Sequence, residues 1–325
     1  MPDPQNPILH MILFDRDGNG GAEITAALGL ISDRVDFAMW APIIPLGIRD
    51  VAAIVGHEPV EALASFYESG CQPSEMCPAS ATIPLGYLKQ AVAMFTWLKI
   101  IPTLDAHHDT NGRSHRLGEN EKGMTALEQF KDESNIQRLA YEATDALIEA
   151  LDRGSFGFWT DSPKYRQRAG LLIRSKEEFD CYYVIGSHRL FLTLLPMIRE
   201  VQSASVAPVV GREYMARLLD GDQKLEELGD TARRAIALLA MKKAVERLPV
   251  EVLPDGVVQV NQSAPVKQRL RAEKEARNAV AASLGADADR YLRQLEDVKA
   301  ALRAEDTPVD YHLPGPIVHS KGMSY

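Results

Sequence analysis

The feature that most constrains this chain is an internal duplication, because related sequences fold into related modules. Two apolar stretches with helical spacing and a proline align at an offset of 154, through the pairs Phe37/Phe191, Trp40/Leu194, Pro42/Pro196 and Ile44/Ile198. Residues 51–64 (VAAIVGHEPVEALA) then match residues 206–219 (VAPVVGREYMARLL) at six of 14 positions. Residues 88–102 match residues 235–249, and both stretches end at a proline. The sequence therefore predicts two related helical modules.

Each module is expected to contain a proline-bearing helix, a turn at Gly56 or Gly211, a short helix, and a longer helix that stops at a proline. Asn111-Gly112 and Asp255-Gly256 follow those prolines and predict two small β-hairpins, over 103–116 and 250–261. Between the modules, residues 120–152 carry apolar side chains at helical spacing before Gly154, which predicts one long helix. The predicted fold class is mostly α.

The sequence composition changes in the last part of the chain, from Ser263 onward. Ser263 and Pro265 predict the start of a helix that runs to Gly285, and a second helical segment covers 287–303. That second segment carries a narrow apolar seam, formed by Tyr291, Leu295, Val298 and Leu302. The seam fits docking either on the chain's own body or on a neighbouring subunit.

Beyond the seam lies a proline-rich extended tail, in which we expect Tyr311, Ile317 and Val318 to contact a partner. The predicted organisation is a first module with its long connecting helix (1–153), a second module (154–262), and a C-terminal helical arm with this tail (263–325).

Charge and cysteine content exclude several classes of protein. The chain has 325 residues, a formal net charge of −9 and a pI near 5.5, which argues against general affinity for nucleic acid or anionic membranes. No leader pattern or membrane-length apolar run is present in the sequence, so we expect synthesis in the cytoplasm and no membrane partner. Cys71, Cys77 and Cys181 form no CxxC pair and are expected to be free thiols.

Residues 15–20 (DRDGNG) resemble the start of an EF-hand loop, with oxygen ligands at the first, third and fifth positions and a glycine at the sixth. The twelfth position, which supplies two oxygens in such loops, is Ala26. The stretch is better interpreted as a turn that leads into a helix.

The densest polar cluster is DAHHDTNGRSHR, which contains Asp105, His107, His108, Asp109 and His115. Imidazole and carboxylate groups bind zinc, but the spacing does not bring three ligands together, so a solvated hairpin tip is the preferred interpretation. Arg113, Arg116, Arg166, Arg168, Arg174 and Arg189 are interpreted as surface or interface residues. No motif of a catalytic or cofactor site occurs, and we expect no cofactor and no metal.

Four stretches carry a resemblance to a known family: VDFAMWAPIIPLGIRDVAAIVGHEPVEAL, WLKIIPTLDAHHDTNGRSHRLGENEK, EEFDCYYVIGSHRLFLTLLPMI and VERLPVEVLPDGVVQV. Over about residues 10–262 the chain resembles an uncharacterised family of proteins from tailed phages and prophages, especially of Bacteroidetes. Members lie among virion structural proteins, which implies a place near the head-to-tail junction and no catalytic residues to transfer. The long C-terminal helical segment and tail depart from the usual pattern of that family.

The resulting hypothesis is a non-enzymatic head-to-tail connector, or neck adaptor. It would form a homo-oligomeric ring that binds portal or tail proteins, with DNA passing through a channel without sequence-specific contact. Its location would be the virion, after assembly in the bacterial cytoplasm. Two alternatives stay open: a tail or baseplate component of a contractile machine, and a metal-dependent hydrolase built on His107, His108, Asp109 and His115.

Overall fold

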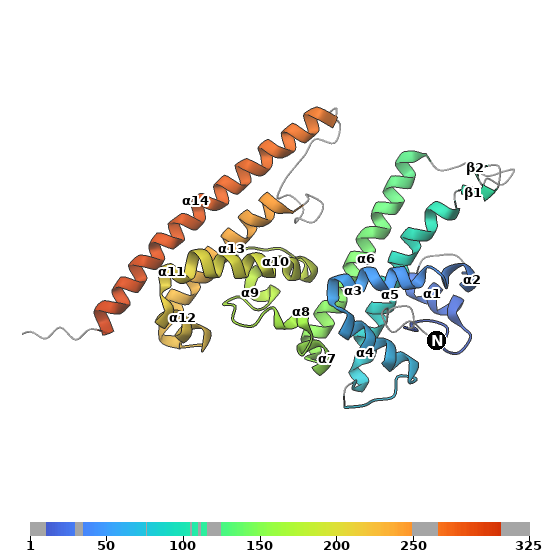
Figure 1. The fold of residues 1–325 in the computed structure, drawn as a ribbon, viewed down its shortest axis with the longest axis horizontal. Helices are drawn as coiled ribbons and strands as arrows, with labels where there is room; N and C mark the ends of the chain where they lie inside the picture. Colours follow the sequence, from blue (N-terminus) through green and yellow to red (C-terminus); the bar gives the residue numbers. More distant parts are fainter. Residues whose placement is uncertain are drawn as a thin grey trace, which may run out of the picture.

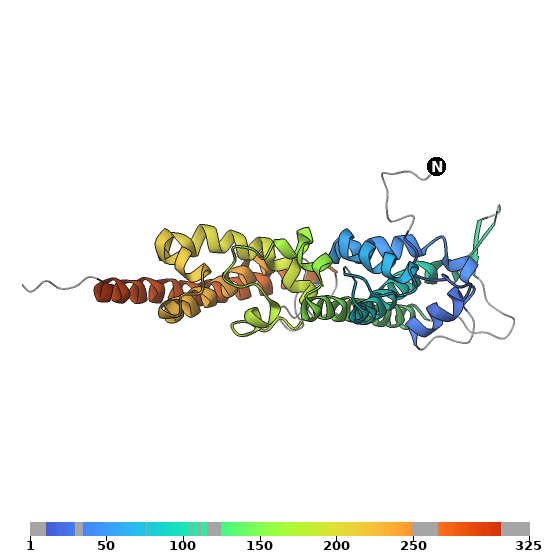
Figure 2. The same ribbon diagram turned by 90° about the horizontal axis from the view of Figure 1, so that it is seen from below.

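The protein is mostly helical and consists of two lobes side by side (Figure 1), seen in a computed structural model. The structure describes residues 11–29, 35–75, 77–104, 106–109, 112–115, 125–248 and 266–306. Seen from below, the two lobes form one long, narrow body (Figure 2). The prediction of a mostly α fold is confirmed.

The first lobe is built around an antiparallel pair of long helices, α5 and α6, which project from the body in Figure 1. Its elements are α1 (Gly20–Leu28), α2 (Phe37–Trp40), α3 (Ile44–Val55), α4 (His57–Glu68), η2 (Ala79–Ala81), α5 (Thr82–Leu104) and α6 (Ala126–Gly154). A capping box between Thr125 and Glu128 begins α6. Trp40 stacks on Trp97 of α5 with ring centroids 5.4 Å apart, as part of the core.

Two short strands follow α5. β1 (Ala106–Asp109) and β2 (Gly112–His115) pair antiparallel, with Ala106 opposite His115 and His107 opposite Ser114. The other expected hairpin, over 250–261, lies outside the described residues.

The second lobe also contains a pair of long helices, α13 and α14, which lie side by side over much of their length (Figure 1). Three short helices, α7 (Gly157–Thr160), α8 (Pro163–Arg166) and α9 (Lys176–Asp180), lead from α6 into this lobe. The lobe itself contains α10 (His188–Val201), the π-helical turn η3 (Gln202–Val206), α11 (Ala207–Val210), α12 (Arg212–Leu219), η4 (Gln223–Leu225), α13 (Glu226–Arg247) and α14 (Val266–Asp306).

Glycine residues with positive φ separate short helices in both lobes. Gly56 has φ 108° and ψ 159° between α3 and α4, and Gly211 has φ 88° and ψ 154° between α11 and α12. Positive φ combined with extended ψ is a conformation that only glycine adopts readily. Each glycine thus ends one helix and begins the next at a fixed angle.

Two predicted helix ends differ from the structure. Pro102 lies inside α5, which continues for two residues to Leu104. Gly285 lies inside α14, where a β-carbon would come 3.1 Å from Lys242 Nζ of α13. Glycine here permits close helix packing, and the packing compensates for the low helix propensity of glycine. By contrast, α13 ends as expected, since Leu248 is extended before Pro249.

The C-terminal segment is therefore not a separate arm up to Asp306. α14 is a single 41-residue helix that packs along α13 and buries Ala281, Leu284, Ala288 and Leu295.

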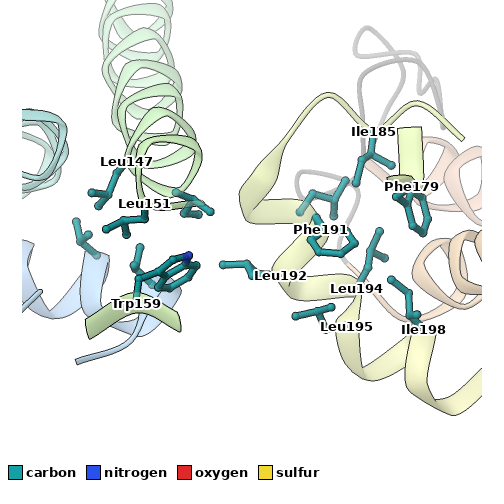
Figure 3. Packing of buried hydrophobic residues seen from close by; sticks show 14 of the residues in the cluster. Leu147, Leu151, Trp159, Phe179, Ile185, Phe191, Leu192, Leu194, Leu195 and Ile198 are labelled. Atoms are coloured by element: carbon teal, nitrogen blue, oxygen red, sulfur yellow. The ribbon is translucent and has the colours of Figure 1, made fainter. Parts of the chain in front are cut away.

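The core runs through both lobes and across the junction between them. Figure 3 shows Leu147, Leu151 and Trp159 facing Leu192, which leads into the cluster of Phe191, Leu194 and Ile198. Each of these side chains is at most 5% exposed. Among the described helices, none has the length and apolar character needed to cross a membrane.

Candidate functional site

The seam expected to contact a partner is occupied within the chain. Leu295 is 0% exposed, and Tyr291, Val298 and Leu302 are partly buried against the core. The structure thus shows docking on the chain's own body, one of the two interpretations of the seam. Tyr311, Ile317 and Val318 lie outside the described residues.

The histidine cluster is described only as backbone. The register of β1 and β2 places Ala106 opposite His115 and His108 opposite Arg113. The side chains of His107, His108, Asp109 and His115 lie outside what the structure describes, and so does all of Asp105. Within the part that is described, no three His, Cys, Asp or Glu side chains form a metal-binding group.

The stretch that resembles an EF-hand is a turn followed by α1. Asp15 Oδ1 accepts a hydrogen bond from Gly20 N at 2.7 Å, and Asp17 forms an ion pair with Arg16 at 2.6 Å. Glu23 accepts a hydrogen bond from the Tyr67 hydroxyl at 2.8 Å and pairs with Lys89. Glu23 thus fastens α1 to α4 and α5, whereas Asp15 and Asp17 make local contacts.

Burial of Tyr67 and its hydrogen bond to Glu23 raise the pKa of this phenol to about 12, although the backbone N–H of Arg16 partly opposes the shift. Lys89 Nζ lies 4.1 Å from the centroid of the Tyr67 ring, in a cation–π position.

The junction between the lobes depends on two aspartates that lie two turns apart on α6. Asp152 accepts hydrogen bonds from Arg168 Nη1 at 2.9 Å, Arg168 Nη2 at 3.0 Å and Trp159 Nε1 at 2.6 Å. Asp145 accepts from the Ser187 hydroxyl at 2.9 Å and from Arg189 N at 2.6 Å. Because residues seven apart share one helix face, both carboxylates reach the second lobe.

Of the arginines interpreted as surface or interface residues, Arg168 is buried and Arg189 is half-buried at the junction between the lobes. Arg168 is 6% exposed and sits against the rings of Trp159 and Tyr165, while Arg189 packs 3.9 Å from the centroid of the Tyr141 ring. The ion pair of Arg168 with Asp152 is costly to break at this depth. No local sequence signal identifies them, since Asp152 and Arg168 lie on different elements 16 residues apart.

A groove of about 900 Å³ lies in the first lobe, between α4, residues 69–74 with Cys77, and α7. Glu58, Glu61 and Asp161 contribute its charge, and no Lys, Arg or His lines it. Phe66 and Phe158 give it an apolar surface, together with Cys77, whose pKa is raised by burial. The groove therefore suits a ligand that combines apolar groups with positive charge. Cys71, Cys77 and Cys181 are free thiols, as expected.

A second surface lies on the projecting pair of helices. Leu127 and Phe130, one turn apart near the start of α6, are 63% and 65% exposed. Large apolar side chains grouped at an exposed tip are typical of interaction sites. Their spacing is that of an ordinary buried helix face, so the sequence alone does not indicate that they are exposed.

The matches to known proteins are few. The family described as "Family of unknown function (DUF6712)" matches residues 65–169 and 190–305. The second match includes α14, so the C-terminal helix belongs to the pattern of this family. No curated protein and no solved structure matches the chain. Since the matched segments cover more than half of its length, the chain belongs to the DUF6712 family.

Proposed function

We propose that this chain is a non-enzymatic structural protein of a tailed-phage particle, a head-to-tail connector subunit that forms a ring and binds portal or tail proteins. The observation that carries the proposal is the apolar tip of the projecting helix pair, Leu127 and Phe130. Contact of leucine and phenylalanine side chains with water is unfavourable. A partner surface that covers them in the assembled state therefore stabilises the assembly. The sequence resemblance to phage virion proteins supports the same role.

The fixed lobe junction fits a ring subunit. Asp145 and Asp152 hold the second lobe against α6 through hydrogen bonds of 2.6–3.0 Å. A rigid body of this kind holds its projecting helices and its groove at a constant separation, as assembly with a portal or tail protein requires. The net charge of −9 fits DNA passing through the ring without sequence-specific contact.

We also propose that the two lobes are duplicated modules. The support is the order of their elements: a helix, a glycine with positive φ, a short helix, and a pair of long helices. In this correspondence α13 and α14 match α5 and α6. Gly56 and Gly211, aligned in the sequence, adopt similar backbone angles.

Light scattering on the purified chain, alone and with the portal protein of the same phage or prophage, tests the connector proposal. We expect a ring-sized assembly or a stable complex with the portal protein. A double Leu127→Ser/Phe130→Ser variant should lose the assembly while keeping its helical content, because both side chains are already exposed.

The control is Val184→Ser, at a side chain that is 73% exposed in the second lobe. This variant should assemble normally. A strictly monomeric wild-type chain that binds no virion protein would contradict the connector proposal. Unchanged assembly of the double variant would show that Leu127 and Phe130 take no part in assembly. The alternative of a tail or baseplate component predicts complexes with tail proteins in place of the portal.

A further inference from the structure

A small cavity beside the lobe junction combines three guanidinium groups. Its volume is about 380 Å³, and it is lined by Tyr165, Arg166, Arg168, Ala169, Gly170 and Arg174. No carboxylate is among these lining residues, although the whole chain carries a net charge of −9. Such a concentration of one charge points to a ligand of the opposite sign.

Neutral groups hold two arginines at this loop. Arg174 donates from Nε to Leu171 O at 3.0 Å and from Nη2 to Leu219 O at 3.1 Å. Arg199, on the adjoining α10, donates to Gln167 O at 2.7 Å and Ala169 O at 3.0 Å. A carbonyl oxygen fixes a guanidinium in place without cancelling its charge.

The carboxylates nearby are already engaged or exposed. Asp152 pairs with Arg168, and Glu178 accepts from the backbone N–H of Arg174 at 2.6 Å. The contact of Arg166 with Asp161 is 3.3 Å long between side chains that are 68% and 77% exposed, so water screens it strongly. An anion can therefore compete for Arg166.

Two further observations concern the wall of the cavity. Arg168 Nε has no hydrogen-bond partner within the described residues and is shielded from solvent, so this guanidinium adds positive charge behind the wall without contacting a ligand itself. Gly170 has φ +72°, and a β-carbon there would meet no atom within 4 Å. The backbone at this position thus leaves open space at the wall of the cavity.

We propose that this cavity binds a tetrahedral oxyanion of the phosphate class, contacted by Arg166 and Arg174 with Arg168 behind them. Guanidinium groups match phosphate oxygens through charge-assisted hydrogen bonds. The site does not depend on the connector role. Its ligand is either a free phosphate compound or a phosphate of a nucleic-acid backbone, and these two sources share one chemistry.

Titration of the full chain with inorganic phosphate, followed through the NMR signals of the arginine Nε–H groups, tests the site. We expect saturable shifts, and at least a tenfold loss of affinity in Arg166→Gln/Arg174→Gln. Arg153→Gln, an exposed arginine of α6 that lines no part of this cavity, is the matched control and should bind as the wild type does. Absence of saturation in the wild type, or equal affinity in the double variant, overturns the proposal.

Arg166→Gln alone guards against misfolding of the double variant, because the ion pair of Arg166 within the described residues is exposed. It should weaken phosphate binding without lowering thermal stability, and unchanged binding here counts against the proposal.

Fluorescence anisotropy with a random-sequence DNA duplex distinguishes a free phosphate compound from the phosphates of a nucleic-acid backbone. Binding that inorganic phosphate displaces and that needs Arg166 and Arg174 assigns the site to a nucleic-acid backbone. Phosphate binding without DNA binding assigns it to a free phosphate compound.

Discussion

Asp152 accepts hydrogen bonds from Arg168 and Trp159, so its loss leaves a buried guanidinium without its counter-ion. We predict that Asp152→Ala lowers the free energy of unfolding by about 3–5 kcal/mol, the usual cost of breaking a buried pair from one side. Urea denaturation measures this change. Asp161→Ala, which removes the exposed partner of Arg166, should cost less than about 1 kcal/mol. Equal losses in the two variants would contradict the role assigned to Asp152.

Ionisation of Tyr67 should lower the stability of the first lobe as the pH rises in the alkaline range. Its pKa in the folded protein is about 12, against about 10 in an unfolded chain. A phenol whose pKa is higher in the folded than in the unfolded state contributes to stability. The contribution is complete below the pKa of the unfolded state and is lost as the pH rises through the pKa of the folded state. We therefore predict that the stability advantage of the wild type over Tyr67→Phe shrinks between pH 10 and 12, measured by urea denaturation. A constant difference across that range would refute the prediction.

At the scale of elements, Gly56 and Gly211 each set the angle between two consecutive helices. Their φ and ψ angles lie in a region open almost only to glycine, so Gly56→Ala and Gly211→Ala should each cost about 1–3 kcal/mol. Gly86, inside α5, is the control: a β-carbon there would meet no atom within 4 Å. Gly86→Ala should stabilise the protein by about 0.5–1 kcal/mol. Thermal unfolding of the three variants gives the comparison.

The sequence predicts helices well where apolar residues recur at regular spacing. Local rules are enough to predict the long helix before Gly154, the turns at Gly56 and Gly211, and the end of α13 before Pro249. Gly285 does not end a helix as predicted, because it packs against a partner helix, α13, which local patterns do not reveal.

The candidate sites were less predictable for the same reason. Arg168 meets Asp152 only through the folding of α7 and α8, and the groove beside α4 forms only when α7 reaches it. Pairing between distant elements is a property of the tertiary structure. The exposed tip at Leu127 and Phe130 was missed because a helical pattern does not tell whether another helix covers the face.

For the whole molecule, the junction around Leu192 should make the two lobes unfold together. Figure 3 places Leu192 between Leu151 and Trp159 of the first side and the α10 cluster of the second. We predict one calorimetric transition for the wild type and two for Asp145→Ala/Leu192→Ala, since this variant removes both polar and apolar contacts at the junction. Two transitions already present in the wild type would show that the lobes are energetically independent.

The position of α14 along α13 has a consequence for synthesis on the ribosome. The helices of the first lobe are complete at Gly154, so this lobe can fold while the rest is still being translated. The second lobe cannot close until α14 has emerged, and until then the face of α13 near Lys242 and Val245, against which α14 packs, lacks its covering helix. A nascent chain that stops before Val266 should therefore expose this face and attract chaperones, even though its first lobe is already native.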